Sequence, residues 1–111
     1  MEPKLSMNIL FVCSRNKWRS FTAETIFKDH PYHQVKSAGT SPSARVKVNA
    51  KHILWADLIL VMEKEHRQKI RQNFNDMLSD KELIVLDIPD DYQYMDEELI
   101  QELEAKVSIY I

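Results

Sequence analysis

Three short stretches dominated by apolar residues constrain the fold of this chain more than any other feature. They occupy residues 8–13, 57–62 and 82–88 and are separated by segments of helical character. Apolar runs of this length, partly β-branched, are typical of strands buried on both faces. Strands that alternate with helices predict a parallel sheet joined by right-handed crossovers.

A further strand and four helices complete the expected architecture. QVKSA (34–38) alternates in polarity and ends in the turn-rich GTSPS, so it is predicted to be the second strand. Helices are expected at residues 20–29, with Ser20 as N-cap, and at 48–56, 63–74 and 97–111. We expect an α/β three-layer sandwich with a four-stranded parallel sheet in the order 2-1-3-4 and helices on both faces. Ligands of such sheets bind at the carboxyl ends of the strands.

The length and the net charge limit the number of domains and the kinds of binding partner that we expect. The 111 residues suit a single domain spanning 1–111, with residues 1–7 expected to form a flexible extension. The formal net charge of −2 carries no sign of a nucleic-acid footprint. The first apolar run is far shorter than a signal-peptide core or a membrane span. We therefore expect a cytoplasmic protein with no nucleic-acid or membrane partner; its oligomeric state stays open.

Cys13 is the only cysteine in the chain, which excludes an internal disulfide framework and a Cys-rich zinc site. One thiol suits a reducing compartment. The four histidines form no convincing set of metal ligands: His30, His33, His52 and His66. We expect neither a metal nor another cofactor.

The segment FVCSRNKWRS (11–20) carries the chemistry. A buried strand ends in Cys13, and Arg19 follows six positions later at the start of a helix. Backbone N–H groups of such a loop and of the first helical turn converge on an anion, and the helix dipole adds positive potential. We expect a phosphate-binding loop made of Cys13, Ser14, Arg15, Asn16, Lys17, Trp18, Arg19 and Ser20.

Each key side chain of this loop has an expected role. The positive field favours the thiolate of Cys13, a nucleophile able to attack phosphorus. Arg19 can hold two phosphoryl oxygens in a fork, and Ser20 can donate a hydrogen bond to the thiolate. Asn16 tolerates the left-handed backbone that tight anion loops need. The competing interpretation is that Cys13 is merely a buried cysteine at a strand end.

Cys13, Asn16, Arg19 and Ser20 together resemble the signature loop of the low-molecular-weight protein tyrosine phosphatases. SAGT (37–40) and ADLILVM (56–62) are similar to segments of that family in the same order. In the family, the cysteine forms a phosphocysteine intermediate. An aspartate in an Asp-Pro-Tyr turn protonates the leaving oxygen and then activates water. The resemblance therefore implies a phosphomonoester hydrolase acting on a phosphotyrosine protein or a small aryl phosphate, with inorganic phosphate or another oxyanion as ligand.

The turn IPDDY (88–92) corresponds to the family's acid turn. The resemblance makes Asp90 the general acid beside the catalytic Cys13 and Arg19, whereas Asp91 stands where the family has proline. Asp91 remains an alternative acid, and both aspartates could be simple turn residues. Trp18, Asp91 and Tyr92 are candidates for the substrate cleft.

The chain departs from the family at Arg15, Trp18 and Phe21, where glycine, cysteine and proline are usual, and it is shorter between SAGT and ADLILVM. These departures motivate a second hypothesis, a non-catalytic phosphate-binding module with a degenerate site. Arsenate reductases on the same scaffold need further cysteines, so a reductase would require an external thiol. The physiological substrate is not predicted.

Overall fold

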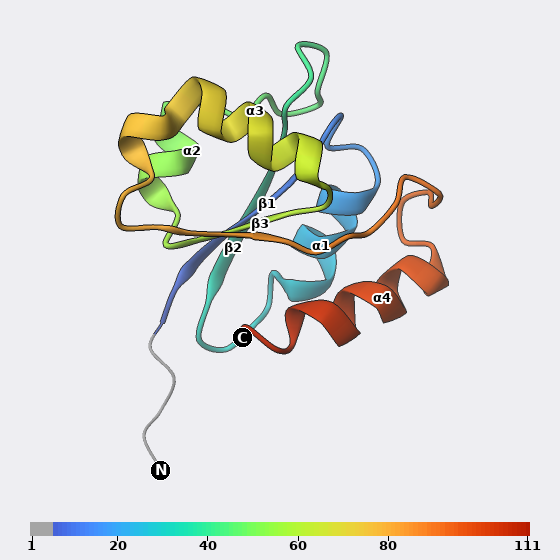
Figure 1. The fold of residues 1–111 in the computed structure, drawn as a ribbon. Coiled ribbons are helices and arrows are strands. Elements are labelled where there is room, and N and C mark those ends of the chain that lie inside the picture. Colours follow the sequence, from blue (N-terminus) through green and yellow to red (C-terminus); the bar gives the residue numbers. More distant parts are fainter. Residues whose placement is uncertain (1–5) are drawn as a thin grey trace.

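The computed structural model describes residues 6–111, so most of the expected extension at 1–7 lies outside the described residues. The chain alternates strands and helices throughout its length (Figure 1). The strands are β1 (Asn8–Cys13), β2 (Gln34–Gly39), β3 (Leu58–Val61) and β4 (Glu82–Val85). The helices are α1 (Arg19–Phe27), α2 (Ala50–Trp55), α3 (Lys64–Phe74), the short 3₁₀ turn η1 (Asn75–Met77) and α4 (Glu97–Val107).

The four strands form one parallel sheet in the order β2-β1-β3-β4, which confirms the predicted topology. β1 lies at the centre and pairs with β2 on one side and β3 on the other. Its last residue, Cys13, is in register with Gly39 at the end of β2. The carboxyl ends of the strands therefore converge where the sequence places the loop.

Helices cover both faces of the sheet, as expected, with α2 and α3 on one side and α1 and α4 on the other (Figure 1). Successive side chains of a strand point to opposite faces. Phe11 and Cys13 accordingly join the buried cluster under α1 and α4, whereas Leu10 and Val12 join the cluster under α2 and α3. A strand that must fill two cores has no room for polar residues, which explains the apolar run at 8–13.

The closing helix buries one face, as its spacing predicts. Leu99, Leu103 and Val107 of α4 are fully buried against the sheet. The helix ends at Val107 and does not continue to residue 111, because the chain turns at 108–110. No helix among residues 6–111 is both long and apolar enough to cross a membrane.

Ser20 is not the N-cap of α1, which corrects the sequence-based expectation. The helix begins at Arg19, and Trp18 occupies the N-cap position without a capping side-chain hydrogen bond. Ser20 lies inside the first turn, fully buried. Its hydroxyl is directed to the core of the loop, where it meets Cys13 and Asn16. The tertiary contact has overridden the local preference of serine for a helix start.

The single glycine of the chain explains how closely β2 and the loop approach one another. A Cβ atom at Gly39 would lie 2.4 Å from the carbonyl oxygen of Ser14 and 2.7 Å from the Cβ of Ala44. Both distances are far inside van der Waals contact. Glycine is required here by close backbone approach and not by an unusual dihedral angle.

Candidate active site

The loop between β1 and α1 is tied together by Asn16. Its backbone adopts the left-handed conformation expected from the sequence, with φ of 57°. The side chain is fully buried, and its Nδ2 donates to the hydroxyl of Ser20 at 2.7 Å. Neighbouring strand-end residues hold the loop from outside, since Thr40 N donates to Cys13 O at 3.0 Å and Ser41 N donates to Ser14 O at 2.9 Å. The loop is therefore held in shape by contacts from within and from β2.

Two donors face the sulfur of Cys13. The backbone N–H of Asn16 donates to Sγ at 3.3 Å, and the Ser20 hydroxyl lies 2.9 Å from the same atom. Because Asn16 Nδ2 already donates to Ser20 Oγ, the one hydroxyl proton of Ser20 is available to the sulfur. Its other acceptor, Ala38 O, is more distant at 3.4 Å. Donors converging on sulfur favour the negatively charged thiolate over the neutral thiol.

Arg19 is buried, and its Nη1 atom is bonded to other protein groups, whereas the edge formed by Nε and Nη2 lies towards Asp90. Nη1 donates to Ile88 O at 2.8 Å and forms an ion pair with Glu63. The opposite edge of the guanidinium, Nε and Nη2, has only the carboxylate of Asp90 nearby, 3.6 Å from Nε, among residues 6–111. Two parallel N–H groups on one edge match two oxygens of a phosphoryl group. The guanidinium is thus prepositioned for the fork-like contact that the sequence suggests.

A pocket of about 310 Å³ opens over this loop. Its lining contains most of the expected loop residues together with the expected acid: Cys13, Ser14, Arg15, Lys17, Trp18, Arg19 and Asp90. The Asp90 side chain is 60 % exposed, so it can reach both solvent and a bound group. Asn16 and Ser20 lie behind the pocket, where they support the thiol.

Two of the three residues expected in the substrate cleft lie elsewhere. Trp18 lines the pocket and is 41 % exposed, as a wall beside the thiol. Asp91 does not line the pocket, and Tyr92 packs against the buried cluster under α4. Of the two adjacent aspartates, only Asp90 is brought next to Arg19.

Glu63 and His66 contact the loop from the segment that follows β3. Sequence reasoning did not assign either residue to the site. Glu63 is the ion-pair partner of Arg19. His66 is fully buried; its Nε2 lies 2.9 Å from Ser14 Oγ, and its Nδ1 accepts from the backbone N–H of Glu63 at 3.0 Å. An available signal was their position, because Glu63 follows a buried strand at the ligand-binding edge and His66 stands three residues on, in capping-box spacing.

Burial lowers the pKa of His66 to about 4, and the positive charges of Arg19 and Lys69 add to the effect. The ring is therefore neutral near pH 7. Since Nδ1 accepts a hydrogen bond, the proton of the neutral ring is on Nε2, which donates to Ser14 Oγ. The hydroxyl proton of Ser14 remains available to a ligand of the loop.

Glu63, Glu65 and His66 bring three potential metal-ligand atoms within 4.8 Å of one another. Both ring nitrogens of His66 already make hydrogen bonds, and Glu63 neutralises Arg19. A cation here would have to compete with the Arg19 guanidinium for the same carboxylate. The donor set does not fit a metal site.

Comparisons with known proteins agree with this geometry. The model of the family described as low molecular weight phosphotyrosine protein phosphatase matches residues 8–56, which contain the whole loop. No curated protein matches the sequence significantly.

Solved structures share the fold over almost the whole chain. The tyrosine phosphatase Wzb from Escherichia coli K30, in complex with phosphate, has 22 % identity and a TM-score of 0.75 over 93 % of this chain and 94 % of its own. Wzb of Vibrio vulnificus, in complex with benzylphosphonate, has the same identity and TM-score over 93 % and 95 %. The arginine phosphatase YwlE from Geobacillus stearothermophilus has 24 % identity and a TM-score of 0.68 over 93 % and 94 %. The resemblance seen in the sequence is confirmed over residues 8–56, where the model of the low molecular weight phosphotyrosine protein phosphatase family matches, and the solved structures share the fold over almost the whole chain.

Proposed function

We propose that this protein is a cysteine-dependent phosphomonoester hydrolase that works through a phosphocysteine intermediate. One observation carries the proposal: the Cys13 sulfur receives donors from Asn16 and Ser20 in a pocket that also holds Arg19 and Asp90. A buried cysteine with a purely structural role needs neither converging donors nor a buried guanidinium lining the same pocket. The arrangement suits attack on a phosphoryl group.

The residues support a two-step reaction. In the first step, Cys13 Sγ attacks phosphorus while the bond from phosphorus to the leaving oxygen breaks, and Asp90 gives that oxygen a proton. Arg19 and the loop N–H groups stabilise the charge on the three phosphoryl oxygens. In the second step, Asp90 takes a proton from water as the water oxygen bonds to phosphorus. The P–S bond then breaks, and Ser20 stabilises the departing thiolate.

The substrate that we propose is an aryl phosphate such as phosphotyrosine. The exposed ring of Trp18 offers a flat apolar wall next to the thiol, against which an aromatic leaving group can stack. The structural relatives include enzymes described as tyrosine phosphatases and as an arginine phosphatase. A free thiol as nucleophile also requires a reducing compartment, which supports our expectation of a cytoplasmic location.

The decisive assay compares wild type with Cys13→Ser on an aryl phosphate, with vanadate as competing oxyanion. We expect turnover by the wild type, inhibition by vanadate and no measurable turnover by the folded variant. Equal turnover by both proteins would remove the mechanism. Peptides carrying phosphotyrosine or phosphoarginine, assayed in parallel, would assign the leaving atom as oxygen or nitrogen.

The competing hypothesis of a non-catalytic phosphate-binding module rests on Arg15 and Trp18, which stand in the loop where the family has smaller residues. Both line the pocket, so they could admit phosphate while obstructing a larger ester. Thermal stabilisation by phosphate, together with no turnover of any phosphorylated substrate, would support the binder and contradict the enzyme.

A further inference from the structure

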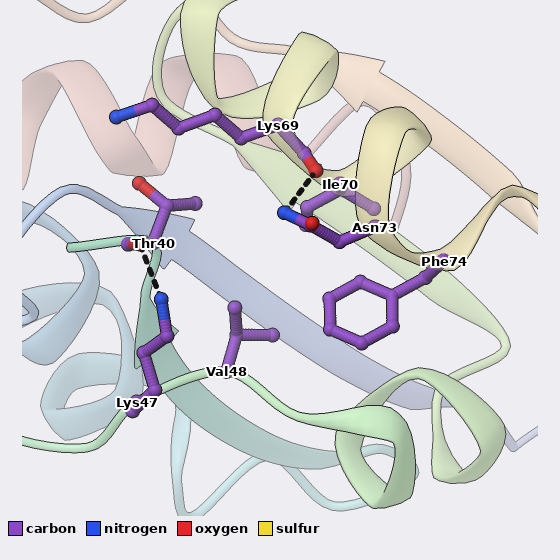
Figure 2. A pocket seen from close by; sticks show the side chains of 7 residues that line it. All are labelled: Thr40, Lys47, Val48, Lys69, Ile70, Asn73 and Phe74. Atoms are coloured by element: carbon purple, nitrogen blue, oxygen red, sulfur yellow. Dashed lines mark hydrogen bonds between the residues drawn. The ribbon is translucent and has the colours of Figure 1, made fainter. Parts of the chain in front are cut away.

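A second pocket, of about 350 Å³, lies between the segment 40–48 and α3, on the α2 and α3 side of the sheet (Figure 2). It shares no lining residue with the pocket over the loop. None of the expected catalytic residues lines this second pocket. Its volume falls in the range of sites for small organic molecules.

One part of this pocket is apolar. Val48 and Ile70 are 5 % and 0 % exposed, and the half-buried Phe74 ring stands at one end of the pocket (Figure 2). All three belong to the core under α2 and α3 or pack against it, so the floor of the pocket is rigid. A flat or compact hydrocarbon group could be buried on this surface, with a gain of roughly 25 cal/mol for each Å² removed from water.

The other end is cationic. Figure 2 shows the ammonium groups of Lys47 and Lys69 and the hydroxyl of Thr40 at the end away from Phe74. Lys47 Nζ donates to Thr40 O at 2.7 Å, which leaves it two further N–H donors. Neither lysine takes part in an ion pair with the carboxylates of residues 6–111. Neither ammonium group therefore has a carboxylate within salt-bridge distance in the part of the chain that the structure describes.

The hydroxyl of Thr40 is an independent sign of a ligand. Thr40 is 6 % exposed, and its Oγ1 has no hydrogen-bond partner among residues 6–111. A buried polar group without a partner costs about 1–3 kcal/mol, so native structures rarely retain one without a reason. An acceptor atom bound beside the two lysines would satisfy it.

We propose that this pocket binds a small organic anion: a carboxylate or phosphate group held by Lys47, Lys69 and the Thr40 hydroxyl, with an apolar body against Val48, Ile70 and Phe74. The backbone N–H of Thr40 also donates to Cys13 O. Thr40 therefore contacts both the proposed anion and the phosphate-binding loop. The end of β2 connects the two pockets, and each pocket binds a different kind of ligand. The loop binds the phosphoryl group of the proposed substrate, whereas this pocket binds an anion that carries its own apolar body.

Benzoate and its neutral analogue benzamide are suitable probes. Their binding to the full chain can be measured by two-dimensional amide NMR, with the loop occupied by inorganic phosphate. We expect benzoate to cause saturable shifts centred on Thr40, Val48 and Asn73, a residue of α3 that also lines the pocket. Benzamide has nearly the same shape but no charge, so it should bind at least about fivefold more weakly.

Lys69→Ala should weaken benzoate binding about fivefold, whereas Lys64→Ala, which removes the same charge from α3 outside the pocket, should not. Both lysines are exposed, so neither change threatens folding. Equal binding of benzoate and benzamide, equal effects of the two variants, shifts confined to residues 13–20, or no saturable shift would each overturn the proposal.

Discussion

The two parts of the candidate active site differ in how they are built. The loop, residues 13–20, is one continuous segment whose internal hydrogen bonds join the thiol, Asn16 and Ser20. Its supports come from distant segments: Glu63 and His66 from the start of α3 and Asp90 from beyond β4. In the proposed mechanism the loop supplies the nucleophile, whereas Glu63 and Ile88 O hold Arg19 and Asp90 supplies the acid. Substitutions in the two parts should therefore have different effects on catalysis and on stability.

The largest effect should follow a change of the loop guanidinium. Arg19→Lys keeps the charge but loses the paired N–H groups and the contact with Ile88 O. We expect kcat/KM for an aryl phosphate to fall about 10³-fold. Steady-state kinetics would measure the loss, with circular dichroism as the control for folding. A loss below tenfold would mean that Arg19 acts only as a point charge.

A smaller effect is expected at the supporting acid. Asp90→Asn should lower kcat about 10²-fold for a poor leaving group such as a phenol of high pKa, and much less for a good one. Asp91→Asn is the matched control, because Asp91 does not line the pocket. If Asp91→Asn gave the larger loss, the acid would be reassigned to Asp91.

The buried histidine should be visible in stability. The pKa of His66 is about 4 in the fold and near 6.5 in the unfolded chain, so the unfolded state binds the extra proton between these values. The stability associated with the neutral ring is complete above pH 6.5 and is lost as the pH falls towards 4. The shift of the His66 pKa corresponds to roughly 3 kcal/mol.

Urea unfolding of wild type and His66→Gln at a series of pH values would measure this contribution. The free energy of unfolding should decline more steeply with falling pH in the wild type than in the variant. Parallel curves would show that His66 does not titrate with folding.

The smallest effect should come from the partner of Arg19. Glu63→Gln removes the ion pair but leaves Ile88 O to hold Nη1, so we expect a loss of about tenfold in kcat/KM. Glu104→Gln, which changes an exposed carboxylate on α4 away from the site, should have little effect. Similar losses in both variants would assign the effect to overall charge and not to positioning.

The sequence predicts the fold well for a physical reason. β1 has to fill two cores and is therefore apolar from Ile9 to Cys13, and α4 shows its buried face in Leu99, Leu103 and Val107. These patterns are local and readable. The contacts of Glu63 and His66 with the loop join residues 44 and 52 positions apart. Their place after β3 points to the ligand-binding edge, but it does not identify their partners in the loop. The need for glycine at position 39 likewise arises from the backbone of a distant segment.

Ser20 illustrates the opposite case, where a local rule gives the wrong role. Serine before a helical run predicts an N-cap, yet its hydroxyl is used by Cys13 and Asn16 inside the first turn. The resemblance favours Asp90 over Asp91 as the acid, and of these two aspartates the structure of residues 6–111 places only Asp90 beside Arg19.

The central claim is that Cys13 carries the phosphoryl group during turnover. Acid quenching of the wild-type protein during turnover of an aryl phosphate, followed by mass spectrometry of its peptides, tests this directly. The account predicts one phosphoryl group on the peptide that contains Cys13, at higher occupancy in Asp90→Asn if hydrolysis of the intermediate becomes limiting, and none in Cys13→Ser. Turnover without any phosphorylated Cys13 peptide in either active protein would contradict it.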